Sequence, residues 1–139
     1  MNVLIDTSVW SLALRRQAGD LSGREKGVVK ELRELVAEGR GRIIGVIRQE
    51  LLSGIKSDAQ FERLRLTLAS FADEVLETGD YEAAARLSNA CRSKGKSTSL
   101  VDMLICAVAI QREWLVFTVD GDFAEYAQIL AVKLHAVRK

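Results

Sequence analysis

Five acidic residues follow or open the regular elements that the hydropathy pattern predicts. They are Asp6, Glu50, Asp102, Asp120 and Asp122. Asp6 comes directly after the apolar run 3–5, and Asp120 comes directly after the apolar run 114–119. In open α/β sheets, ligands bind outside the carboxyl ends of the strands, so acids at these positions are expected to converge on one edge. Because a buried carboxylate is costly unless it is paired, hydrogen-bonded or bound to a cation, such an edge needs a partner.

The residue types favour a divalent cation as that partner. No lysine or arginine is adjacent in sequence to any of the five acids, and ligands that are all oxygen select Mg²⁺ or Mn²⁺. A cation held in this way activates water and stabilises the charge that develops during phosphodiester cleavage. The hydroxyls of Ser8 and Thr118 are placed to orient carboxylates or waters. The single histidine, His135, excludes chemistry that needs a histidine pair.

Each acid also has a purely local interpretation. Asp6 is suited to cap a helix that starts after it. Ser99 and Asp102 have the spacing of a capping box, in which the acid returns to the backbone N–H of Ser99. The remaining acids fit a turn or a solvated helix face. Each interpretation stays open for a single residue, but four such coincidences at strand ends favour a shared site.

Length and composition are those of an ordinary globular protein. The chain has 139 residues, of which 48% are hydrophobic and 28% charged, and it is expected to form one domain over residues 1–139. The net charge of +1 neither requires nor excludes a nucleic-acid partner. No apolar run has the 18 or so residues of a membrane span, and no signal peptide is recognised, so we expect a cytoplasmic protein without a membrane partner.

Short apolar runs alternate with helical patterns along the whole chain. Strands are expected at residues 3–5, 42–46, 73–78, 114–119 and 131–137. Helices are expected at residues 7–19, 24–39, 47–54, 57–71, 80–95, 97–113 and 120–130. This alternation predicts an α/β fold of three layers, with helices on both sides of a central, mostly parallel sheet of four to five short strands.

Four segments carry a resemblance to a known family. The stretches "VLIDTSVW", "VIRQELLSG", "STSLVDMLICAVA" and "VFTVDGDF" resemble the ordered acid motifs of PIN-domain ribonucleases. Within that family the chain most resembles the VapC-type toxins of bacterial toxin–antitoxin pairs. The resemblance extends over nearly the whole chain and implies a PIN-like α/β/α fold. The stretch "RIIGVIRQE" departs from the pattern, because it lacks the hydroxyl often found a few residues before the glutamate.

The resemblance implies a role for each matched position. Asp6, Glu50, Asp102 and Asp120 correspond to the catalytic acids, and Thr7, Ser8, Thr118 and Asp122 to residues that support them. Asp6, Asp102 and Asp120 are the expected ligands of Mg²⁺ or Mn²⁺, with Glu50 holding a second metal or orienting the attacking water. Whether Asp120 or Asp122 is the main fourth acid stays open. Such proteins cleave RNA, form homodimers that sometimes join into larger assemblies, and are silenced by a cognate antitoxin.

Basic residues near the expected site are candidates for phosphate contacts. They are Arg15, Arg16, Lys94 and Lys96. Two other functions remain open beside the endoribonuclease. One is a PIN-like protein that binds RNA or a partner without cutting, which the loss of an acid would favour. The other is a receiver-type signalling domain with a phosphoacceptor aspartate, which typically has paired acids after the first strand, whereas Asp6 has no acidic neighbour.

Overall fold

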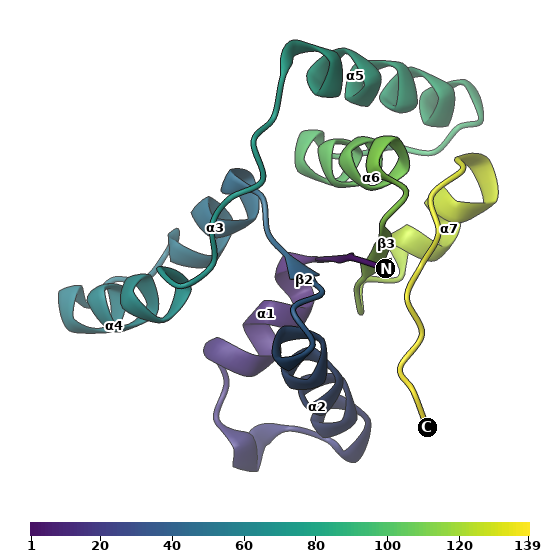
Figure 1. Cartoon of the computed structure of the whole chain (residues 1–139). Helices are drawn as coiled ribbons and strands as arrows, with labels where there is room; N and C mark the ends of the chain where they lie inside the picture. The colour runs from purple at the N-terminus through teal and green to yellow at the C-terminus, as the bar shows by residue number, and fades with distance from the viewer.

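A buried three-residue strand forms the centre of the protein. The computed structural model describes residues 1–139, and in it β1 (Val3–Ile5) pairs with β2 (Gly41–Arg42) on one side and β3 (Leu115–Phe117) on the other (Figure 1). Both pairings are parallel. All three residues of β1 are fully buried, which explains why the run is continuously apolar rather than alternating.

Seven α-helices and one 3₁₀ turn surround this sheet. They are α1 (Thr7–Leu14), the 3₁₀ turn Ala18–Asp20, α2 (Gly23–Ala37), α3 (Gly45–Leu52), α4 (Asp58–Leu68), α5 (Thr78–Ser93), α6 (Leu100–Arg112) and α7 (Asp122–Ile129). Three of the turns after helices use glycine with positive φ, at Gly39, Gly54 and Gly95. A left-handed backbone at these positions ends α2, α3 and α5 where the sequence predicted stops.

The sheet has three strands, so the expectation of four to five is wrong. Residues 73–78 and 131–137 run beside the sheet, but each makes only one isolated parallel bridge, Ile43 with Asp73 and Val116 with Leu134. The first of these segments turns into α5 at Thr78. The second is held by side chains, because His135 Nε2 lies 2.5 Å from Glu31 Oε2 on α2, and Arg138 also pairs with that carboxylate. Backbone hydrogen bonds also join both segments to the sheet. The N–H of Glu74 donates to the Ile43 carbonyl at 2.9 Å, the N–H of Val116 to the Lys133 carbonyl at 2.9 Å, and the N–H of His135 to the Val116 carbonyl at 2.8 Å. Each segment thus continues the sheet for a single bridge and forms no strand of its own.

The helix expected over residues 7–19 ends at Leu14, and two other helices differ from the prediction at their starts. The expected strand 42–46 ends at Arg42, because the backbone turns into α3 with Ile44 as its N-cap. Asp80 is not the N-cap of α5, which is Glu77, but the third residue of its first turn, where its Oδ2 completes a capping box by accepting a hydrogen bond from the backbone N–H of Glu77 at 2.9 Å. In both cases the helix starts earlier than the pattern of apolar residues indicates.

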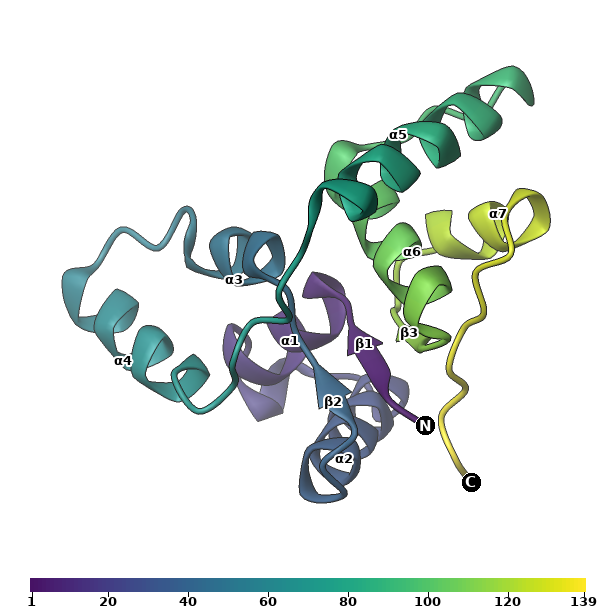
Figure 2. The same ribbon diagram turned by 45° about the horizontal axis from the view of Figure 1, so that its top comes forward.

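Helices cover both faces of the sheet and enclose one apolar core. Helices α1 and α2 lie on one side of β1, while α6 lies on the other side with α5 packed along it (Figures 1 and 2). The core comprises 29 buried residues. Helix α6 contributes an unbroken buried run from Met103 to Ala109, as expected for a helix in contact with neighbours on several sides. No helix is both long and apolar enough to span a bilayer.

Candidate active site

The register of the parallel sheet places Asp6 beside Thr118. Ile5 of β1 is paired with Phe117 of β3, and the backbone N–H of Asp6 donates to the Phe117 carbonyl at 2.9 Å. The next residue on each strand therefore lies at the same carboxyl edge. Trp10 anchors this corner from inside, because its Nε1–H donates to the Ile5 carbonyl at 3.1 Å.

The Asp6 carboxylate is held through one of its oxygens. Oδ2 accepts hydrogen bonds from Ser8 Oγ at 2.6 Å and from Thr118 Oγ1 at 2.8 Å. Asp6 is only 5% exposed, and its Oδ1 accepts no hydrogen bond from the chain. No fully buried side-chain oxygen or nitrogen lacks a partner in this protein, so Oδ1 reaches the surface and stays open to a ligand. Asp6 also caps α1, by accepting from the Ser8 backbone N–H.

Asp102 enters the site from the first turn of α6. Its Oδ2 accepts a hydrogen bond from the Tyr126 hydroxyl on α7 at 2.8 Å. Burial raises the pKa of the Asp102 carboxyl above its usual range, and the charges of Asp6 and Asp120 raise that pKa further, while the Tyr126 hydrogen bond partly offsets them. A cation near these acids would stabilise their charged forms.

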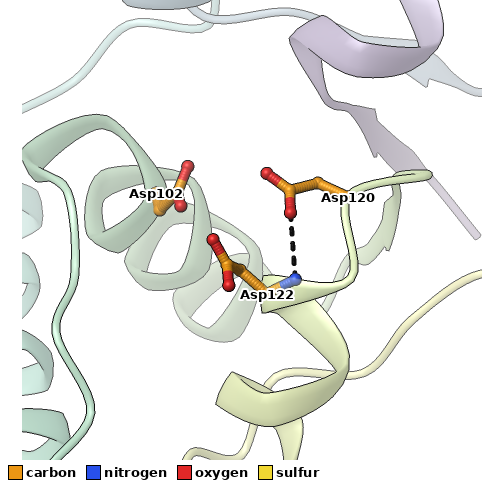
Figure 3. A group of neighbouring side chains, drawn as sticks. All are labelled: Asp102, Asp120 and Asp122. Atoms are coloured by element: carbon orange, nitrogen blue, oxygen red, sulfur yellow. Dashed lines mark hydrogen bonds between the residues drawn. The ribbon is translucent and has the colours of Figure 1, made fainter.

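Asp120 and Asp122 reach the same space from the loop between β3 and α7. Asp120 Oδ1 accepts from the backbone N–H of Asp122 at 2.9 Å, and Thr118 Oγ1 accepts from the backbone N–H of Asp120 at 3.0 Å. One carboxylate oxygen from each of Asp102, Asp120 and Asp122 lies within 4.8 Å of the other two (Figure 3). Figure 3 shows the three side chains converging from α6, the loop and the start of α7.

Glu50 lies at the outer edge of this arrangement. It is exposed near the end of α3, and its Oε1 accepts a hydrogen bond from Thr7 Oγ1 at 2.6 Å. Thr7 directly follows Asp6, so this bond ties α3 to the first turn of α1.

A lysine reaches the acidic cluster from a distant part of the sequence. Lys96 Nζ lies 2.9 Å from Asp122 Oδ1 and 3.0 Å from Glu125 Oε2, and it stands 5.5 Å from the centre of the Tyr126 ring. These carboxylates raise the pKa of the Lys96 ammonium, first through their hydrogen bonds. Lys96 was expected to contact RNA phosphates, but its ammonium is engaged on α7 in this structure.

The other predicted basic residues have different surroundings. Arg16 forms an ion pair with Glu25 at 3.2 Å, Lys94 is exposed at the end of α5, and Arg15 is exposed at the end of α1. None of these three contacts the acidic cluster.

The sequence did not predict the contact of Tyr126 with Asp102, and it predicted only one of the two hydrogen bonds between Ser99 and Asp102 correctly. Tyr126 is one helical turn after Asp122, a spacing that places both on one face of α7, but nothing in the sequence connects it to Asp102. Ser99 Oγ accepts from the Asp102 backbone N–H at 3.0 Å, as in a capping box. The Asp102 side chain hydrogen-bonds to Tyr126 and faces the other acids, so no bond returns to the Ser99 N–H.

The cluster has the chemistry of a divalent-cation site. Asp102, Asp120 and Asp122 offer three carboxylate oxygens at ligand-like separations. Asp6 lies outside this group but close enough for its charge to raise the pKa of Asp102. Hard oxygen ligands of this kind suit Mg²⁺ or Mn²⁺. The metal set expected from the sequence was Asp6, Asp102 and Asp120; the compact cluster contains the last two and adds Asp122.

Comparison with known proteins gives one family and a consistent set of folds. The family model described as PIN domain matches residues 3–129. No protein of curated function matches the sequence significantly. Similar solved structures include FitAcB from Neisseria gonorrhoeae, with 24% identity, a TM-score of 0.73 and 96% of both chains covered.

Two further structures have the same fold at lower identity. VapBC2 from Rickettsia felis, bound to a DNA fragment from its promoter, has 16% identity and a TM-score of 0.71, with 97% of this chain and 98% of the other covered. VapC20 from Mycobacterium tuberculosis, described as a sarcin–ricin loop cleaving toxin, has 20% identity and a TM-score of 0.64, with coverage of 95% and 99%.

Proposed function

This chain belongs to the PIN domain family, and from that premise we propose that it is a metal-dependent endoribonuclease that acts in the cytoplasm as the toxin of a toxin–antitoxin pair. The observation that carries the proposal is the convergence of Asp102, Asp120 and Asp122, whose carboxylate oxygens lie within 4.8 Å of one another. The family match over residues 3–129 supports nuclease chemistry at that edge. The similarity to VapC20, which is described as a sarcin–ricin loop cleaving toxin, supports RNA as the substrate.

The proposed roles follow from the contacts of each acid. Asp6, Asp102 and Asp120 hold Mg²⁺ or Mn²⁺, with Asp122 as a further ligand on the same side. When bound, the cation activates water and neutralises charge on the phosphate. Ser8 and Thr118 fix Asp6 through Oδ2, so that Oδ1 is turned toward the site. Glu50, held by Thr7, orients the attacking water or takes its proton, and is the candidate ligand for a second cation.

Cleavage of total cellular RNA by the purified protein tests this function. We expect discrete fragments with Mg²⁺ or Mn²⁺. We expect none with EDTA, because the proposed mechanism needs a bound cation to activate the attacking water. The ends of the fragments identify the target. If antitoxin-free protein binds RNA but cuts it with neither cation, the protein is a non-catalytic PIN-like binder instead.

The Tyr126 hydroxyl is expected to matter for metal binding. Tyr126→Phe removes the donor to Asp102 but keeps the ring, which packs edge-on against Phe123 at 5.3 Å between centres. Loss of a hydrogen bond that orients a ligand typically costs about 10- to 100-fold in metal affinity or activity. Mn²⁺ titration calorimetry and RNA cleavage rates measure the two effects. Unchanged Mn²⁺ affinity in a variant that melts normally would show that Tyr126 does not position Asp102.

The proposed partners are a cognate antitoxin and a second copy of the chain. Support for an antitoxin comes from the similar folds, one of which is described as a toxin–antitoxin complex from Klebsiella pneumoniae. Support for a homodimer comes from an apolar surface hollow of about 300 Å³ between α3, α5 and α6. Its rim includes Leu100, which is 89% exposed, and Tyr81, which is 56% exposed. Exposed apolar patches of this kind mark interaction sites.

If the apolar hollow is the dimer interface, a charge introduced at its rim should weaken the dimer. Leu100→Glu is expected to shift the protein from dimer to monomer, because a carboxylate would have to lose its water at the centre of the interface. Sedimentation velocity measures the change. Leu66→Glu is the matched control, since Leu66 is 62% exposed on α4, outside the hollow. A dimer that survives Leu100→Glu would place the interface elsewhere.

A further inference from the structure

A basic groove opens at the far end of α1 from Asp6. It is a hollow of about 670 Å³ between the end of α1, the α3–α4 connection and α4. Three of its nine lining residues are cations, Arg15, Lys56 and Arg63, and none is acidic. Leu14 and Ile55 add apolar surface to its wall. We use the name basic groove for this hollow.

The charges of the basic groove are uncompensated. Arg15, Lys56 and Arg63 are all exposed and form no ion pair within the chain. Their neighbours behave differently: Arg16 pairs with Glu25, and Arg65, two residues after Arg63, pairs with Glu62 at 2.7 Å. Three unpaired cations around one hollow create a local positive potential that a net charge of +1 conceals.

Two helices connect this groove to the candidate active site. Helix α1 is capped by Asp6 at one end and by Arg15 at the other, a separation of about 14 Å at 1.5 Å per residue. The end of α3 lies alongside α1. Glu50 of α3 contacts Thr7 at the start of α1, and Gly54, just after α3, lines the groove together with Leu14 at the end of α1. A strand whose phosphate lies at the acids can therefore continue along α1 into the groove.

We propose that the basic groove binds the phosphate backbone of single-stranded RNA a few nucleotides from the bond that is cut. This inference rests on the proposed ribonuclease function and assigns it a substrate-binding surface. Arg15, Lys56 and Arg63 contact phosphates, which supplies salt-dependent affinity without sequence preference. Leu14 and Ile55 contact sugars or base faces. An acidic protein segment is the competing occupant, and it lacks the continuity with the acids that a bound strand has.

The chain offers a closely matched pair of variants for the test. Arg63→Gln removes an unpaired charge inside the groove, whereas Arg65→Gln removes a charge from the same helix that is already paired with Glu62 and does not line the groove. Binding of a fluorescent single-stranded RNA is measured in EDTA over a range of salt concentrations, and KM and kcat for its cleavage are measured with Mg²⁺. A poly-glutamate peptide serves as the acidic competitor.

We expect Arg63→Gln and Lys56→Gln each to weaken RNA binding roughly threefold to tenfold and to lower the salt slope by about 0.7 per charge. KM should rise by a similar factor with kcat unchanged, and Arg65→Gln should match the wild type. If Arg63→Gln and Arg65→Gln have the same RNA affinity and the same KM, the basic groove does not bind the RNA, although the ribonuclease proposal still stands. The same conclusion follows from a loss of poly-glutamate binding without loss of RNA binding. Failure of the ribonuclease proposal is separate, since it appears as absence of metal-dependent cleavage in the wild type.

Discussion

Asp6→Asn is expected to abolish RNA cleavage while the protein stays folded. The amide oxygen of asparagine can accept the hydrogen bonds that Ser8 and Thr118 donate to Oδ2. Its NH₂ group then takes the place of Oδ1 and directs donors, instead of a negative oxygen, into the site. Loss of one preorganised electrostatic group typically costs roughly 10²- to 10³-fold in rate, and loss of a metal ligand belongs at the upper end of that range.

Initial cleavage rates with Mg²⁺ and a thermal melt measure the two halves of this prediction. Asp20→Asn is the matched control, because Asp20 is an exposed acid in the 3₁₀ turn after α1, away from the sheet edge. Its rate should equal that of the wild type. An Asp6→Asn variant that cuts within a factor of about two of the wild type would refute the role of Asp6 as a metal ligand.

Arg112→Met is expected to destabilise the fold strongly, although Arg112 lies outside the site. Arg112, at the end of α6, donates to Glu74 Oε2 at 2.7 Å and to both oxygens of Asp80 at 2.8 and 3.1 Å. It also donates to the Val75 carbonyl at 3.2 Å. Asp80 is 4% exposed, so the variant leaves a carboxylate buried without its partner. Breaking a pair of this kind costs about 3 kcal/mol of unfolding free energy.

The pH dependence of that loss has a defined sign. Arg112 holds the pKa of the Asp80 carboxyl below its usual range, first through their hydrogen bonds. Asp80 therefore contributes stability above the unfolded carboxyl pKa of about 3.9, and this contribution is lost as pH falls through the lower folded value. The difference between wild type and Arg112→Met should be constant near neutrality and shrink in acid.

Urea denaturation at a series of pH values measures this difference. Arg86→Met is the control, because Arg86 is exposed on α5 and forms no ion pair. It should change the unfolding free energy little at any pH. A pH-independent loss in Arg112→Met would attribute the effect to packing of the side chain rather than to its pairing with Asp80.

Local patterns were sufficient for most helices because helix formation depends on neighbours within one or two turns. The apolar periodicity located α2, α4 and α6 to within a few residues, and the glycine stops after α2, α3 and α5 were right. Strand pairing depends on partners far away in sequence, which explains the main error. Residues 73–78 and 131–137 have strand-like composition, yet each makes only a single bridge, with residues far away in the sequence.

The sequence by itself determined that several acids follow strands or open helices. Asp6 follows the apolar run 3–5 and Asp120 follows the apolar run 114–119, and the structure pairs residues of these two runs as parallel strands. Only the tertiary structure decided how those acids are held. The bond from Tyr126 to Asp102, the Lys96 bridge to Asp122 and Glu125, and the bond from Thr7 to Glu50 all join separate elements. Such contacts depend on how the helices pack against one another, and the spacing of residues along the sequence does not predict this packing.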